Sequence, residues 1–145
     1  MMRSKYSRIS TSRLSSNNKK KKKILFVDDE PDMTAMLKMA LESVGFTVDI
    51  FNDPVPALKS FKPNLYDLVI LDVKMQKMDG FELYNQLKQV DSDIKVCFLT
   101  ASSEMYREEL KKERHCELSK DLFLQMPLPI NRIIEEINRR VNSSP

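Results

Sequence analysis

The sequence predicts an α/β protein in which helices cover both faces of a parallel β-sheet. Three short runs, at residues 24–27, 68–71 and 96–99, consist only of apolar residues, as strands buried on both faces do. Stretches with apolar residues at helical spacing lie between these runs. Strands and helices that alternate along a chain are typical of a parallel sheet. We therefore expect a doubly wound α/β sheet built from five β–α units.

The first expected strand, 24–27, is followed by an amphipathic helix. This helix starts near Pro31 and ends before Gly45, because proline suits a first helical turn and glycine a C-terminal end. Its inward stripe consists of Met33, Met36, Leu37, Ala40, Leu41 and Val44. Residues 47–51 form a second strand, whose partly alternating pattern suits a more exposed position, and residues 54–61 form a short second helix.

The second half of the chain repeats this order. Strand 68–71 precedes a third helix, strand 96–99 precedes a weaker helical pattern around 105–110, and 122–124 is a short fifth strand. Pro129 opens the fifth helix. The inward positions of the third helix are Phe81, Tyr84, Leu87 and Val90. Those of the fifth helix are Ile130, Ile133, Ile134, Ile137 and Val141.

Charge divides the chain into two unequal parts. The chain has 145 residues, the length of one domain, with 24 basic and 21 acidic residues and a net charge of +3. Residues 1–23 contain nine of the basic residues and no acidic one, which leaves 15 basic and 21 acidic residues in 24–145. Because the first segment is polar and repels itself, we expect a disordered basic tail at 1–23 and a folded domain at 24–145.

Composition excludes several classes of protein. No apolar stretch is long enough for a membrane-spanning helix, and none follows the basic start as it does in a signal peptide. Two cysteines, Cys97 and Cys116, are too few for a disulfide scaffold. Two glycines, Gly45 and Gly80, cannot build a glycine-rich phosphate loop. A cytoplasmic globular protein is the expectation.

Acidic and hydroxyl side chains stand directly after the expected strands. Asp28 and Asp29 follow the first strand, Asp72 follows the third, and Thr100 follows the fourth. Ligands of such sheets bind beyond the carboxyl ends of the strands, so these side chains should meet. Crowded carboxylates resist ionisation, and a bound Mg²⁺ ion removes that cost. A single aspartate is also explained as a helix N-cap, but the whole set favours a functional site.

Four segments resemble the receiver domain of response regulators in two-component signalling. They are ILFVDDEP at 24–31, DLVILDVKM at 67–75, MDGFEL at 78–83 and FLTA at 98–101. The similarity covers about residues 24–141, and the chain ends shortly after the fifth helix, as in a stand-alone receiver. The resemblance implies a flavodoxin-like sheet of strand order 2-1-3-4-5 with five helices.

The resemblance also implies a phosphoryl and metal site. Asp72 would accept a phosphoryl group from a histidine kinase or a phosphotransfer protein, as a stoichiometric phosphoacceptor and not as an enzyme. Asp28 and Asp29 would bind Mg²⁺ together with Asp72 and the backbone carbonyl of Lys74. The metal aligns the reacting groups and neutralises charge, which is most of what phosphoryl transfer requires.

Signal output is implied to depend on two further residues. Thr100 would hydrogen-bond the phosphoryl group, and Phe123 would turn inward as Thr100 moves towards that group. The face formed by the fourth helix, the fifth strand and the fifth helix would then change shape and bind an output protein whose identity the sequence does not indicate. One local charge thus biases a two-state equilibrium.

The sequence departs from the family pattern at the end of the fifth strand. Met126 precedes Pro127 where the family has lysine, and a thioether cannot pair with Asp72 or with a phosphoryl group. Lys74 and Lys77 could supply a positive charge, although from another strand. Two interpretations follow: phosphorylation with an altered rate or weakened output, or a pseudo-receiver that binds a partner with little or no phosphotransfer. We favour the first, because the acidic residues would otherwise have no role; a metal-binding fold without signalling is a third alternative.

The lysine run at 19–23 allows electrostatic binding to nucleic acid or to an anionic membrane surface. No aromatic residues are interleaved with it, and no nucleic-acid-binding motif accompanies it. We therefore favour a solubilising tail, and a start codon assigned too early would explain the same run.

Overall fold

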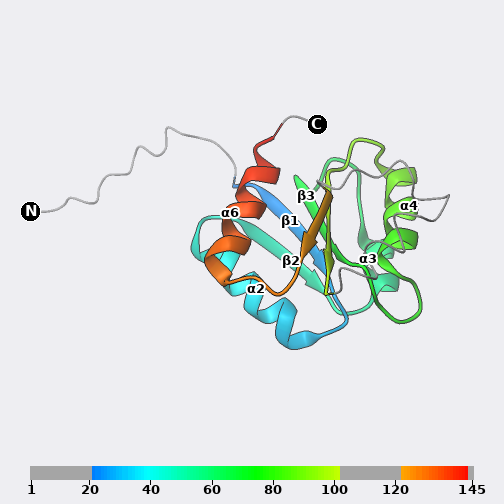
Figure 1. Cartoon of the computed structure of the whole chain (residues 1–145). Helices are drawn as coiled ribbons and strands as arrows, with labels where there is room; N and C mark the ends of the chain where they lie inside the picture. Colours follow the sequence, from blue (N-terminus) through cyan, green and yellow to red (C-terminus); the bar gives the residue numbers. More distant parts are fainter. Residues whose placement is uncertain (1–20, 102–121, 144–145) are drawn as a thin grey trace, which may run out of the picture.

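The described residues, 21–101 and 122–143, form a five-stranded parallel sheet in a computed structural model of the chain (Figure 1). The strands are β1 (Lys23–Val27), β2 (Thr47–Phe51), β3 (Leu68–Asp72), β4 (Val96–Thr100) and β5 (Phe123–Gln125). The helices are α2 (Pro31–Ser43), α3 (Pro54–Ser60), α4 (Gly80–Val90) and α6 (Ile130–Val141).

The sheet confirms the expected topology. Its strand order is β2-β1-β3-β4-β5, and all four pairs of neighbouring strands are parallel. β1 begins at Lys23, one residue before the expected start. The helix expected around 105–110 lies outside the described residues, so the described parts of the chain contain four of the five expected helices. None of the described helices is long and apolar enough to cross a membrane.

Two apolar layers, one on each face of the sheet, explain the uninterrupted apolar runs. Successive strand residues point to opposite faces, so Ile24 and Phe26 pack with α2 and α6, whereas Leu25 and Val27 pack with α3 and α4. All four side chains are fully buried. A strand covered on both faces has no solvent side and therefore no polar alternation.

Four positions expected to face inward are exposed instead: Met36, Val44, Val90 and Ile130 are 41 to 51% exposed. Val44 lies beyond the last residue of α2, and Val90 and Ile130 are terminal residues of their helices. At or beyond the end of a helix these side chains are less covered than residues in its middle, such as Leu87 and Ile133. Met36 lies beside the buried stripe of α2, whose centre is formed by Leu37 and Leu41.

Candidate functional site

The candidate site lies where β1 and β3 end side by side. The register pairs Val27 with Leu71, so the next residues, Asp28 and Asp72, follow at the same level of the sheet. Oxygen atoms of Asp28, Asp29 and Asp72 all lie within 4.8 Å of one another. The structure therefore brings together the three acidic residues that the sequence places at strand ends.

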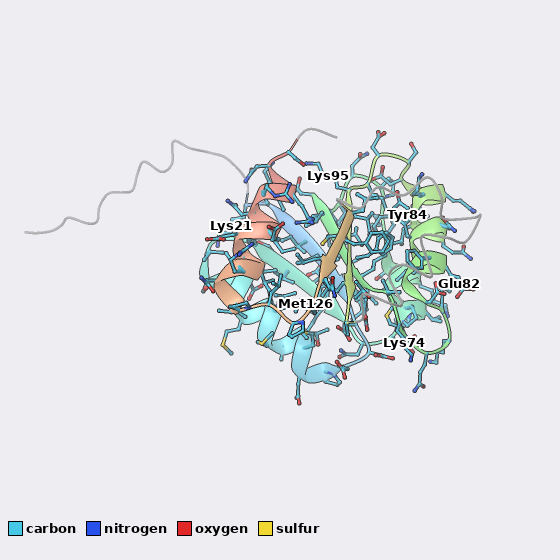
Figure 2. All side chains as sticks on the ribbon, in the orientation of Figure 1. Lys21, Lys74, Glu82, Tyr84, Lys95 and Met126 are labelled. Carbon is cyan, nitrogen blue, oxygen red and sulfur yellow. The ribbon has the colours of Figure 1, made fainter. Side chains whose placement is uncertain are left out.

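A cavity of about 240 Å³ lies at this end of the sheet. Its walls include the three carboxylates and Thr100, which is 2% exposed. Lys74 and Met126 also line it, and Figure 2 shows both at the end of the sheet opposite Lys95. Every residue expected at the site, except Phe123, therefore lines this cavity.

Hydrogen bonds fix the position of Asp28, which is 3% exposed. Its Oδ1 accepts a hydrogen bond from the backbone N–H of Glu30 at 3.0 Å. Its backbone carbonyl accepts a hydrogen bond from Nδ2 of Asn52 at 2.8 Å, and the same Nδ2 donates to Oγ1 of Thr34 at 2.9 Å. Asn52 therefore joins the ends of β1 and β2 to the first turn of α2.

The role of Asn52 was not expected, although the sequence carries a signal for it. Asn52 follows β2 directly, as Asp28 follows β1, whereas Asp72 and Thr100 are the last residues of β3 and β4. The rule that functional side chains follow the carboxyl ends of parallel strands applies equally to β2. Applied to every strand, it identifies Asn52 as a site residue.

The loop after β3 completes the acidic site. Oδ1 of Asp72 accepts a long hydrogen bond, of 3.4 Å, from the backbone N–H of Lys74. Oδ2 of Asp29 accepts one of 3.2 Å from the backbone N–H of Gln76. The loop thereby links the carboxylates that follow β1 and β3.

Gly80, the first residue of α4, allows this loop to return close to β3. Its N–H donates to the carbonyl of Val73 at 3.0 Å. A Cβ atom at this position would lie 2.4 Å from the backbone oxygen of Asp72, which is closer than any side-chain carbon is found. The start of α4 is held there by a capping box between Asp79 and Glu82. Only glycine therefore fits against the backbone of Asp72.

Burial and mutual repulsion make ionisation of the site's carboxylates unfavourable. Burial, reinforced by the negative charges of Glu30 and Asp29, raises the pKa of Asp28 to about 6. Burial, together with the charges of Asp28 and Asp29, raises the pKa of Asp72 to about 7. Near neutral pH the pair therefore retains protons that isolated aspartates would lose. A cation among these oxygen atoms would remove the cause of both shifts.

Phe123 lies apart from the acidic side chains. It is 8% exposed, and its ring centroid lies 5.3 Å from that of Phe98 and 5.9 Å from that of Phe81. The ring is thus buried against these two aromatic rings. The end of its strand is connected to Thr100, whose carbonyl accepts a hydrogen bond from the N–H of Met126 at 2.7 Å.

The two lysines of the loop after β3 differ in their surroundings. Nζ of Lys77 lies 2.6 Å from Oδ2 of Asp53, the N-cap residue of α3, and Lys77 does not line the cavity. Among the described residues that do line it, Lys74 alone carries a positive charge. The half-buried Met126 contributes an apolar wall.

Comparisons with known proteins show which family the chain is similar to. The family model of the response regulator receiver domain matches residues 24–138. The sensor protein EvgS of Escherichia coli K12 is 36% identical over 107 residues, which are 74% of this chain and 9% of EvgS. The alkaline phosphatase synthesis transcriptional regulatory protein PhoP of Bacillus subtilis is 35% identical over 120 residues, 83% of this chain and 47% of PhoP. The chain thus spans less than half the length of either relative.

Solved structures of similar proteins share the fold. The response regulator TrrA of Thermotoga maritima, in complex with Mg²⁺ and BeF, superimposes with a TM-score of 0.64 at 31% identity, covering 81% of this chain and 97% of TrrA. A response regulator receiver domain protein of Clostridium thermocellum gives a TM-score of 0.68 at 26% identity, covering 83% and 94% of the two chains.

Proposed function

The chain belongs to the response regulator receiver domain family of two-component signalling, and we propose that it accepts a phosphoryl group on Asp72. The observation that carries this proposal is the convergence of Asp28, Asp29 and Asp72 on one cavity. Asp72 ends β3 and is the carboxylate that the family resemblance assigns as the acceptor. Thr100 lines the same cavity, where its hydroxyl could reach a group attached to Asp72.

The acidic residues fit a magnesium ion. Asp28, Asp29 and Asp72, with the backbone carbonyl of Lys74, would hold it, since Mg²⁺ prefers oxygen ligands and completes its shell with water. The raised pKa values of Asp28 and Asp72 are the expected property of a carboxylate cluster that functions with a cation. When bound, the ion neutralises charge on the phosphoryl group during its transfer.

The proposed reaction transfers a phosphoryl group from a phosphohistidine of a histidine kinase or a phosphotransfer protein. A carboxylate oxygen of Asp72 attacks phosphorus in line with the P–N bond. That bond breaks as the new P–O bond forms, and the departing imidazole keeps the electron pair. The product is an acyl phosphate on the protein itself, so the chain acts as a stoichiometric phosphoacceptor and not as an enzyme.

Output would depend on the connection between Thr100 and the fifth strand. A hydroxyl donor that moves towards the new phosphoryl group shifts the end of β4, to which Met126 is hydrogen-bonded. β5 carries Phe123, and the carbonyl of Phe123 accepts a hydrogen bond from Arg140 of α6 at 3.2 Å. We propose that an output protein binds the face that includes β5 and α6 and distinguishes the two states.

A pseudo-receiver is the second candidate, and Met126 is the observation that favours it. Its uncharged side chain lines the cavity where the family has an ammonium group. Without that charge a phosphoryl group is less well stabilised, and the protein would then function by binding a partner through an unmodified surface.

Intact-mass measurement after incubation with a small phosphodonor and Mg²⁺ separates the two candidates. The wild type should gain one phosphoryl group, and the gain should be absent in Asp72→Ala and after chelation of the metal. Asp67→Ala serves as a control, since Asp67 lies at the opposite end of β3, where its carboxylate accepts a hydrogen bond from the N–H of Lys23. Absence of any gain with small donors and with kinase donors would leave the pseudo-receiver.

A further inference from the structure

We propose that Lys74 supplies the positive charge that pairs with the phosphoryl group on Asp72, in place of the ammonium that Met126 does not provide. This inference rests on the proposed phosphoacceptor function. It selects Lys74 from the two loop lysines that could supply a positive charge, and it adds a phosphoryl-binding role for the side chain to the metal-binding role expected of the backbone carbonyl.

The charge balance of the site calls for a cation. Asp28, Asp29 and Asp72 converge on the cavity, and Glu30 lines it as well. Phosphorylation would replace the single negative charge of Asp72 with the two charges, at most, of an acyl phosphate. One divalent ion cannot balance all of these, and the thioether of Met126 carries no charge.

Lys74 is both near enough and free to move. Its backbone nitrogen lies 3.4 Å from Oδ1 of Asp72. A lysine side chain extends about 6 Å from its Cα atom, so the ammonium group can reach a phosphoryl group bonded to that carboxylate. The side chain is exposed, lines the cavity, and forms no ion pair with the described residues. Within the described part of the chain, no ion pair of this side chain has to break for it to turn inward.

Lys77 is the obvious competitor, and the structure argues against it. Its ammonium group is held 2.6 Å from Oδ2 of Asp53, and it lies outside the cavity lining. Turning towards Asp72 would leave Asp53 without this partner. The two lysines, three positions apart in one loop, therefore form a matched pair for an experiment.

The expected effect of Lys74 is moderate. An exposed lysine loses side-chain freedom when it pairs, and salt screens its charge. A phosphoryl group is a stronger partner than a single carboxylate, because its oxygen atoms accept charge-assisted hydrogen bonds. We expect Lys74 to tighten phosphoryl binding roughly three- to tenfold at low ionic strength.

The experiment uses the full chain with Mg²⁺ and beryllium fluoride, a phosphoryl mimic that needs no phosphodonor. Fluorine NMR or calorimetry measures the Kd of the fluoride complex for wild type, Lys74→Met, Lys74→Arg and Lys77→Met. Lys74→Met should weaken binding roughly three- to tenfold, with a smaller difference in high salt. Lys74→Arg should restore the wild-type value, and Lys77→Met should leave it within about twofold. Mg²⁺ affinity without fluoride is measured for each variant as well, so that an effect on fluoride binding is separated from an effect on metal binding.

Met126→Lys provides a second, independent test of the role of Lys74. An ammonium group at the end of β5 should tighten fluoride binding, and the loss caused by Lys74→Met should become smaller in that background than in the wild type. A loss of equal size in both backgrounds would show that Lys74 does not replace the missing charge.

The failure of this inference can be told apart from that of the proposed function. If the wild type binds beryllium fluoride and Lys74→Met binds it equally well, the role of Lys74 is wrong and the phosphoacceptor function stands. If the wild type binds no beryllium fluoride and gains no phosphoryl group, both are wrong.

Discussion

At the scale of single residues, the site is defined by carboxylates that lie closer together than their charges favour. Asp28 and Asp72 are adjacent because β1 and β3 are adjacent and in register. Sequence reasoning could predict this, since both residues directly follow apolar strands. It could not predict the ion pair of Lys77 with Asp53. That pair depends on the path of a loop in which Lys77 takes a φ of 73°.

The raised pKa of Asp72 predicts how stability depends on pH. The folded metal-free protein holds this proton up to about pH 7, whereas the unfolded chain releases it near 3.8. The folded state therefore loses stability as the pH rises from about 4 to about 7, and this loss is complete above that range. Asp72→Asn should raise the free energy of unfolding by about 1–2 kcal/mol at pH 8 and change it little at pH 4.5.

Denaturant unfolding in the presence of a chelator at both pH values checks this prediction. Asp93→Asn is the control, because Asp93 is exposed on the turn after α4 and should show no such difference. Added Mg²⁺ should stabilise the wild type at pH 8 but not Asp72→Asn. A stabilisation by Asp72→Asn that is equal at both pH values would contradict the assigned electrostatics.

At the scale of elements, the site depends on how closely α4 approaches β3. The segment MDGFEL at 78–83 contains the start of this helix, where Asp79 and Glu82 form a capping box. The same segment contains Gly80. Only the three-dimensional structure shows that the backbone of Asp72 occupies the space that a side chain at Gly80 would need. A contact of this kind has no counterpart in the periodic spacing of apolar residues, so the sequence pattern does not predict it.

Gly80→Ala should therefore damage the metal site as well as the fold. The new Cβ atom must displace the carbonyl of Asp72, which we expect to lower the free energy of unfolding by about 2–3 kcal/mol. The displaced carboxylate should also bind Mg²⁺ more weakly in a calorimetric titration.

Gly45→Ala is the matched control for that variant. Gly45 has a φ of 106° and no neighbouring atom within 4 Å of a Cβ position, so alanine introduces only backbone strain of about 1–2 kcal/mol. Its Mg²⁺ affinity should equal that of the wild type. Equal Mg²⁺ affinities for both alanine variants would show that the contact at Gly80 does not position Asp72.

Asn52→Ala tests the connection between β1, β2 and α2. The substitution removes hydrogen bonds to the carbonyl of Asp28 and to Thr34, and should cost about 1–2 kcal/mol of stability. Mg²⁺ binding should weaken because Asp28 is less well held. Asn142→Ala, which removes side-chain hydrogen bonds between the C-cap residue of α6 and Asn138, should leave Mg²⁺ binding unchanged. An unaltered Mg²⁺ affinity in Asn52→Ala would contradict a positioning role.

At the scale of the whole molecule, the sequence predicts the architecture well. The apolar strands, the amphipathic helices and their alternation along the chain all indicate the same fold. Fully apolar strands require a helix layer on each face, and the structure has α2 and α6 on one side and α3 and α4 on the other (Figure 1). The edge position of β2 follows from its mixed pattern. The ends of helices are less predictable, as the exposure of Val44, Val90 and Ile130 shows, since amphipathic spacing continues to and beyond the residues where the helices end.

The division into a basic tail and a folded domain is tested by two deletions. Removal of residues 1–20 should leave thermal stability and Mg²⁺ affinity unchanged. Removal of residues 1–23 also deletes hydrogen bonds of Lys22 and Lys23 with Thr47 and Asp67, and should lower stability by about 2–3 kcal/mol. Thermal unfolding of the three chains measures the difference. A large loss of stability on deletion of residues 1–20 would show that the tail belongs to the domain.

The central claim is that Asp72 is the phosphoacceptor, and chemical trapping of the phosphorylated protein tests it most directly. Borohydride reduces an aspartyl phosphate to homoserine, which peptide mass spectrometry then locates in the chain. After incubation with a phosphodonor and Mg²⁺, homoserine should be found at position 72 and at no other aspartate. Homoserine at another position, or none at all after incubation with small donors and kinase donors, would contradict the account.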